Sequence, residues 1–339
     1  MSVPIVAFFN NKGGVGKTSL VYHMAWMYAD NDWRVLAADL DPQANLTAAF
    51  LNEDRLEEVV FQDGSKADTI YECIRPLVRG IGDVDNPVLE PIKEDSLFDN
   101  LALLAGDLSL SGFESQLAAA WPNCADGDER AFRVESAFWR IIQQAAKQHD
   151  ADLVLMDLGP NLGSINRAAL IAADYVVIPL APDLFSIKGM RNLGPTLREW
   201  RTQWTERLQK NPAPDLSLPK GRMEPIGYTV QQHSIRLDRP VKAYERWISL
   251  MPNVYRQEIL DEPPAEGMSV RDDPHCLALL KHYRSLMPLA QEARKPMFKL
   301  TYADGAIGAH AKAARDSYDD FGHLAKQIAD RIQATPQFA

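Results

Sequence analysis

The 339-residue sequence lacks the features of membrane, secreted and disulfide-stabilised proteins. No uninterrupted apolar run approaches the ~20 residues of a membrane-spanning helix, and the first residues enter an apolar segment without a secretion-signal pattern. We therefore expect a cytoplasmic protein. The few cysteines are odd in number, far apart and without a C-x-x-C pair, which argues against a disulfide framework and against an iron–sulfur or zinc site: Cys73, Cys124 and Cys276.

An overall excess of positive charge is also absent, because the formal net charge is −10. The charge is unevenly distributed. Residues 52–99 contain 13 acidic and 5 basic side chains, whereas residues 186–210 contain six basic side chains against two acidic ones. The second segment could offer one face to a polyanion, although solvated helix surfaces explain such runs equally well.

Apolar runs alternate with helical patterns along most of the chain. The predicted strands are Val3–Phe9, Arg34–Asp39, Leu101–Leu104, Leu153–Met156, Tyr175–Pro179 and Ile226–Val230. The predicted helices are Thr18–Asn31, Thr69–Val78, 132–149, Asn166–Ala173, Lys188–Leu208, Pro240–Leu250 and Ser317–Gln333. This alternation predicts an α/β fold of the doubly wound type, with a mostly parallel sheet covered by helices on both faces.

A glycine-rich segment lies between the first strand and the first helix, Lys12-Gly13-Gly14-Val15-Gly16-Lys17-Thr18-Ser19. Glycines let closely spaced backbone N–H groups approach phosphate, and the helix N-terminus adds positive potential. Lys17 is predicted to reach the outer phosphates of a nucleotide, and Thr18 to hold Mg²⁺ through its hydroxyl. The general phosphate-loop pattern is met in part, since Asn11 occupies its first glycine position.

Carboxylates follow two of the apolar strands. Asp39 and Asp41 end the second strand, where alternation places them on one side of the sheet edge that binds ligands in such folds. Asp157 ends the strand that begins near Leu153, in the manner of a Walker B acid that binds Mg²⁺ through water. Acidic strand ends without a ligand are common, so this prediction depends on the glycine-rich loop beside them.

The segment Lys-Gly-Gly-Val-Gly-Lys-Thr resembles the deviant Walker A motif of the ParA/MinD ATPases. The resemblance implies catalytic roles for Lys12, Lys17 and Asp41: Lys12 touches the ATP of a partner subunit, and Asp41 orients the attacking water. It also places Asp39 near Mg²⁺. The family usually has x-Pro-Pro after the Walker B acid, whereas Leu158-Gly159-Pro160 follows Asp157 here. The likeness indicates a single P-loop ATPase domain over residues 1–339, with inserts at about 52–99 and 261–295.

Within this family, the ParA-type members position DNA or other cargo. The resemblance implies a homodimer formed on ATP binding, slow hydrolysis that resets it, nonspecific DNA binding, and a cargo adaptor or ATPase-stimulating protein as partner. Arg198 and Arg236 fall where DNA-contacting arginines are expected. DNA binding would make the protein nucleoid-associated. The final helix has too few cations for a membrane anchor. The alternative is a metabolic P-loop synthetase of the cobyrinic acid or dethiobiotin type.

Overall fold

The computed structural model describes residues 2–61, 68–92, 100–232, 241–281, 283 and 286–333. Within these ranges a central sheet of eight strands forms, all parallel except for one antiparallel edge pair, β3 with β4. The strand order is β3 (Glu90–Pro91), β4 (Leu101–Leu104), β2 (Val35–Asp39), β5 (Leu153–Asp157), β1 (Ile5–Phe8), β6 (Tyr175–Leu180), β7 (Glu224–Gln232) and β8 (Cys276–Lys281).

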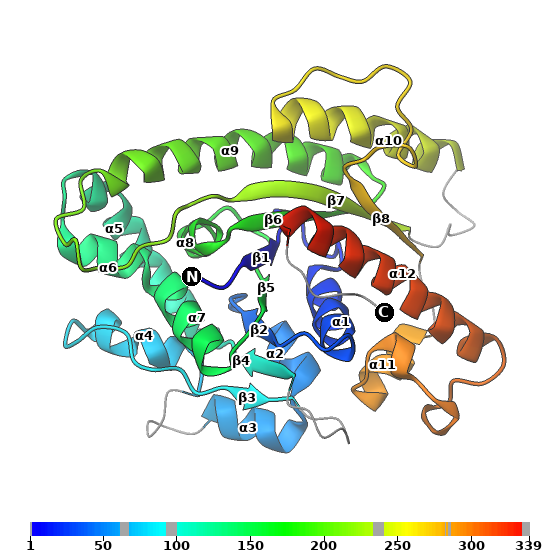
Figure 1. The fold of residues 1–339 in the computed structure, drawn as a ribbon, viewed down its shortest axis with the longest axis horizontal. Coiled ribbons are helices and arrows are strands. Elements are labelled where there is room, and N and C mark those ends of the chain that lie inside the picture. Colours follow the sequence, from blue (N-terminus) through cyan, green and yellow to red (C-terminus); the bar gives the residue numbers. More distant parts are fainter. Residues whose placement is uncertain are drawn as a thin grey trace.

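Helices cover both faces of this sheet (Figure 1). One face packs against α4 (Ile70–Arg79), α5 (Glu114–Ala125), α6 (Glu129–Glu135), α7 (Ala137–Gln148), α8 (Ser164–Ala172), α9 (Leu184–Leu208) and α10 (Val241–Val254). The other face packs against α1 (Lys17–Asp30), α2 (Asn45–Phe50), α3 (Glu53–Phe61), α11 (Leu286–Ala293) and α12 (Ala309–Ile332). The predicted doubly wound, mostly parallel α/β fold is therefore confirmed.

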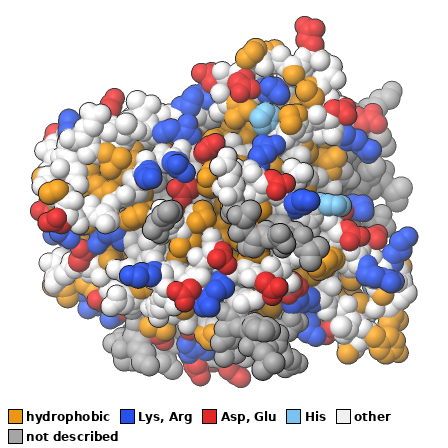
Figure 2. Space-filling view, in the orientation of Figure 1, with side chains coloured by type: hydrophobic (Ala, Val, Ile, Leu, Met, Phe, Trp, Pro, Cys, Tyr) orange, Lys and Arg blue, Asp and Glu red, His pale blue; other side chains and the backbone are white. Residues whose placement is uncertain are grey.

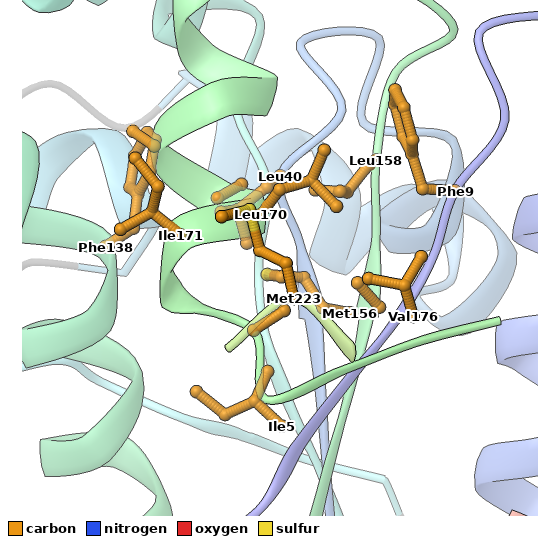
Figure 3. Close-up of a cluster of buried hydrophobic side chains, with 14 of the residues drawn as sticks. Ile5, Phe9, Leu40, Phe138, Met156, Leu158, Leu170, Ile171, Val176 and Met223 are labelled. Carbon is orange, nitrogen blue, oxygen red and sulfur yellow. The ribbon is translucent and has the colours of Figure 1, made fainter. Parts of the chain in front are cut away.

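Side-chain alternation divides the core into two apolar layers. Along β1, Ile5 and Ala7 belong to the layer under α7 and α8, whereas Val6 and Phe8 belong to the layer under α1 and α12. Residues just beyond the strand ends continue this pattern, and Figure 3 shows Leu40 and Leu158 in the first layer together with Phe9. Because these leucines are anchored in the core, the aspartates next to them face the opposite side of the sheet.

All six predicted strands are present, with ends shifted by at most two residues. The sequence pattern missed β8, which pairs in parallel with β7 inside the segment regarded as an insert at 261–295. It also missed α11, in the same segment. The acidic segment 52–99 contains α3, α4 and the short β3 in its described parts. The second segment is thus part of the central sheet and contributes to the core.

Helix α9 lies along the sheet and packs against the π-helical turn η2 (Tyr255–Leu260) (Figure 1). The contact is close because Gly194 has no side chain. A Cβ at Gly194 would lie 2.5 Å from the carbonyl carbon of Glu258 and 3.1 Å from the Cα of Ile259. Backbone atoms cannot give way as a flexible side chain can. Glycine is therefore required at this crossing.

We predict that Gly194→Ala lowers the free energy of unfolding by about 3 kcal/mol or more, because α9 must move away from η2. Gly112→Ala is the matched control, since a Cβ there meets no described atom within 4 Å, and it should change stability by about 0.5 kcal/mol at most. Urea unfolding followed by circular dichroism measures both. Equal stability of the two variants would contradict the assigned close contact.

Candidate phosphate-binding site

The glycine-rich loop connects β1 to α1 at the carboxyl edge of the sheet. Gly14 and Gly16 have φ values of +71° and +77°, in the left-handed region that favours glycine. Val15 is buried, with 1% of its surface exposed, and it does not line the cavity beside the loop. The other residues predicted for phosphate binding line one cavity: Gly13, Gly14, Gly16, Lys17, Thr18 and Ser19.

The N-terminus of α1 opens toward this cavity without a protein cap. The N-cap residue is Gly16, and the first turn has neither a capping side chain nor an acidic residue. The first N–H groups of a helix lack intrahelical acceptors and carry the positive end of the helix dipole. An anion held by the loop would satisfy these donors, which is how helix N-termini bind phosphate.

Lys17 brings a buried cation into the same place. The residue is 7% exposed, and its Nζ donates a hydrogen bond of 3.3 Å to the carbonyl oxygen of Lys12. Burial lowers the pKa of Lys17, while the nearby carboxylates of Asp157 and Asp41 oppose that shift. The ammonium group is therefore held between the loop backbone and two acids, a position from which it can reach a bound phosphate.

Asp39 and Asp157 lie side by side, as register partners on β2 and β5, and both are fully buried. Burial raises the pKa of each carboxyl, and the charge of Asp39 raises the pKa of Asp157 further. Neither carboxylate oxygen of Asp157 makes a hydrogen bond of normal geometry with a described residue, although the nearby Thr18 hydroxyl favours its ionised form. A buried carboxylate with unpaired oxygens is a ready ligand for a cation or its waters.

The oxygens of Asp39 are already engaged within the chain. Asp39 Oδ2 accepts hydrogen bonds of 2.8 Å from both the backbone N–H and the hydroxyl of Thr47, and its Oδ1 accepts one from the Asp41 N–H. The sequence therefore brought Asp39 to the predicted place, and the structure gives it the additional task of fixing the turn after β2. Direct contact of Asp39 with Mg²⁺ stays a prediction.

Asp41 lines the cavity and is 6% exposed. Its Oδ1 accepts a hydrogen bond of 3.0 Å from the Gln43 N–H, which fixes the carboxylate at the end of the turn. Among the described residues no group of three or more His, Cys, Asp or Glu side chains forms a metal site. This is compatible with Mg²⁺, which is usually held by one or two carboxylates together with phosphates and water.

The cavity has a volume of about 700 Å³ and extends from the loop along α1 to α11. Sequence reasoning missed its far wall, which consists of Met287, Ala290, Gln291, Arg294 and Lys295. Arg294 also donates a hydrogen bond to the carbonyl oxygen of Leu51. The apolar run Cys276–Leu280 could have predicted the extra strand before α11, but nothing in the sequence placed α11 at this cavity.

Lys12 is turned away from its own cavity. Its Nζ forms an ion pair with Asp183, whose carboxylate also caps α9 by accepting a hydrogen bond of 2.9 Å from the Ser186 N–H. The Lys12 side chain is 23% exposed. The residues next to Asp183 are apolar and exposed, since Leu184 is 39% and Phe185 66% accessible. In one subunit, therefore, Lys12 is restrained by α9 at the surface of the molecule.

The cations of α9 are mostly directed inward. Arg198 donates hydrogen bonds of 2.6 and 3.2 Å to the carbonyl oxygens of Glu258 and Ile259, and two other arginines of the helix also donate to backbone carbonyls: Arg201 and Arg207. Lys188 and Arg191 remain exposed. On the face drawn in Figure 2, basic and acidic side chains are interspersed. Arg236 lies outside the described residues.

The parallel sheet, the left-handed glycines and the uncapped N-terminus of α1 define a P-loop nucleotide-binding protein of the doubly wound type. The family AAA_31, described as an AAA domain, matches residues 3–210. The chain belongs to the ParA-type ATPase family, whose members are P-loop NTPases. Within the described residues, no helix combines the length and apolar character needed to cross a membrane.

Known relatives agree with this assignment. The chain is 31% identical to the sporulation initiation inhibitor protein Soj of Bacillus subtilis over 57% of its length and 64% of that protein. It is 28% identical to the chromosome partitioning protein ParA of Myxococcus xanthus, over 57% of each chain. The chain spans 41% to 64% of the length of four such relatives. Cyanothece McdA(D38A), solved as an ATP complex, shares the fold with a TM-score of 0.59 and 14% identity, covering 100% of this chain and 99% of that one.

A buried histidine in the cavity wall, His23, is expected to make the stability of the fold depend on pH. His23 is fully buried, its Nδ1 lies 2.7 Å from the Ser19 carbonyl oxygen, and its Nε2 accepts a hydrogen bond from the Met297 N–H. Burial lowers its pKa from 6.5 to about 4. The unfolded chain therefore binds this proton more readily, and stability should fall by about 3 kcal/mol as the pH decreases from 6.5 to 4.

We predict that His23→Gln flattens this pH dependence while lowering stability at neutral pH. Chemical denaturation between pH 7 and pH 4.5 measures the slope. The exposed His323 on α12 provides the control, and His323→Gln should keep the slope of the wild type. An unchanged slope in His23→Gln would show that other groups cause the acid sensitivity.

Proposed function

We propose that this protein binds ATP with Mg²⁺ and hydrolyses it slowly. The observation that carries the proposal is the arrangement around one cavity of a buried Lys17, the free N–H groups of α1 and the unpaired carboxylate of Asp157. Thr18 and Asp157 would hold Mg²⁺, with Asp39 close by. The metal would supply positive charge to the phosphates. The ATP complex of McdA(D38A) supports the choice of nucleotide.

Hydrolysis requires a positioned water and neutralisation of the charge that develops on the transferred phosphoryl group. Asp41 would orient that water, and its position supports this role, since it lines the cavity beside the loop that follows Asp157. Lys17 supplies one cation in the same subunit. A carboxylate that orients water without a covalent intermediate fits a slow reaction that acts as a timer.

The second cation would come from another copy of the chain. Lys12 does not line its own cavity, and it lies at the surface next to the exposed Leu184 and Phe185. We propose that ATP binding brings two subunits together at this edge, with each Lys12 moving from Asp183 to the partner's phosphates. Exposed apolar side chains beside the lysine are suited to contact a second subunit.

We predict that Lys12→Ala abolishes ATP-dependent dimerisation while the monomer still binds ATP. Asp183→Asn should have the opposite effect, because asparagine keeps the cap on α9 and releases Lys12 from its ion pair. Two such pairs are released for each dimer formed, so the dimer should tighten by up to about thirtyfold, as expected for two partly exposed ion pairs of up to about 1 kcal/mol each. Sedimentation velocity with ATP and with ADP measures both variants, and an intact Lys12→Ala dimer would refute the role of Lys12.

The output of the switch would be nonspecific DNA binding by the ATP dimer, which positions or segregates DNA or another cargo in the cytoplasm. The name of the Myxococcus xanthus relative, a chromosome partitioning protein, supports this choice. An adaptor or ATPase-stimulating protein would reset the cycle. The metabolic synthetase remains the alternative, and the family assignment favours the partition-type ATPase.

We predict that ATP, and not ADP, lets the protein shift random-sequence DNA at low salt, and that Asp41→Ala prolongs the bound state. On α9, the exposed cations Lys188 and Arg191 should contribute most to DNA binding. Replacing either by alanine should reduce the slope of log K against log salt concentration by about 1 for every phosphate contact that is lost. Arg198→Ala should instead lower the unfolding free energy by about 1–3 kcal/mol. Weaker DNA binding by Arg198→Ala at unchanged stability would favour direct contact.

A further inference from the structure

The loop between β5 and α8 contains a glycine, Gly159, two residues after Asp157. The φ of Gly159 lies outside the left-handed region, so backbone freedom does not explain the glycine. Space does. A Cβ at this position would lie 3.2 Å from Oδ1 and 3.5 Å from Cγ of Asp41. The Asp41 carboxylate therefore packs directly on the Gly159 backbone.

The same stretch of backbone is held by Asn166 of α8. Asn166 is 1% exposed, and its Nδ2 faces three acceptors: the carbonyl oxygen of Gly159 at 2.9 Å, the carbonyl oxygen of Asn161 at 2.6 Å and Asn161 Oδ1 at 3.0 Å. Three acceptors around one buried amide define the path of the loop much more tightly than a single hydrogen bond would.

The helix that carries Asn166 is itself fixed from outside the cavity. Glu114, at the start of α5, accepts hydrogen bonds of 2.5 Å from the Ser164 N–H and 2.9 Å from the Ile165 N–H. A carboxylate at these first N–H groups stabilises a helix N-terminus. Neither contact involves a nucleotide. The position of Asn166, and through it that of Gly159, is therefore set before any ligand binds.

The amide oxygen of Asn166 is a second observation that indicates a role beyond packing. Asn166 Oδ1 is buried and accepts no hydrogen bond from a described residue. Buried acceptors are nearly always paired, with protein or with an ordered water. A water bound at this oxygen would lie close to the backbone on which Asp41 rests.

We propose that Asn166 is a positioning residue for hydrolysis. It holds the Gly159 peptide in place, so that the Asp41 carboxylate packed against this peptide faces the attacking water. The inference rests on the proposed role of Asp41 in orienting water. It assigns Asn166 no contact with the nucleotide, so its loss should affect turnover more than binding.

The test compares Asn166→Ala and Asn166→Ser with the wild type. Steady-state ATPase assays give kcat, and calorimetry with Mg²⁺ and ATP gives Kd. Loss of the amide should reduce kcat roughly tenfold or more, because small displacements of a catalytic group are costly, while Kd stays within about threefold. The serine hydroxyl can donate one hydrogen bond, so Asn166→Ser should retain a larger part of the activity. Asn211→Ala is the control, since its amide bonds to Ala213 outside the cavity.

A double-mutant cycle separates positioning from general damage. If Asn166 acts through Asp41, Asn166→Ala should reduce kcat little further in an Asp41→Ala background. Equal reductions in both backgrounds would overturn the proposal, as would a wild-type kcat for Asn166→Ala. Gly159→Ala provides an independent variant that displaces Asp41 from the other side, and it should show the same loss of kcat at unchanged Kd. Failure of Asp41→Ala itself to lower kcat would instead refute the proposed function.

Discussion

The buried charge at the carboxyl edge of the sheet is the constraint on which the other features depend. Asp39 and Asp157 are register partners without solvent access, and Asp41 is close by. Lys17 contributes a buried positive charge near Asp157 and Asp41. Carboxylates so placed repel one another, and burial raises the pKa of Asp39 and Asp157. The fold tolerates this because Thr47 donates two hydrogen bonds to Asp39 and because Leu158 anchors the neighbouring strand end in the core. A bound cation would relieve the remaining repulsion.

Helix α9 connects this charged edge to the opposite side of the molecule. Its N-terminus contacts the phosphate loop through the ion pair between Asp183 and Lys12. Gly189 lets the helix lie close to the residue that precedes the loop, since a Cβ there would be 3.1 Å from Asn10 Oδ1. Its middle crosses η2 at Gly194. A change in the partner of Lys12 would therefore act on the helix that also carries the exposed Lys188. The positive charge of this segment serves mainly to hold the fold together, which the count of its charges could not reveal.

Much of the site could be predicted because its residues are close in sequence to strand ends. The glycine spacing identified the loop, and the apolar runs before Asp39 and Asp157 placed both acids on one edge, where the structure finds them. The wall formed by α11 was missed because nothing local in Met287 or Arg294 points to a phosphate loop some 270 positions earlier. The inward direction of Arg198 was missed for the same reason, since its partners are the carbonyl oxygens of Glu258 and Ile259.

The sequence by itself determined the alternation of strands and helices, the left-handed glycines of the phosphate loop and the acids that end β2 and β5. These follow from local sterics and from apolar periodicity, which a short segment contains in full. Only the tertiary structure decided which oxygens of Asp39 are occupied, which partner Lys12 takes and how Asn166 holds Gly159. Such hydrogen bonds depend on where distant segments meet when the core closes, and no short stretch of sequence contains that information.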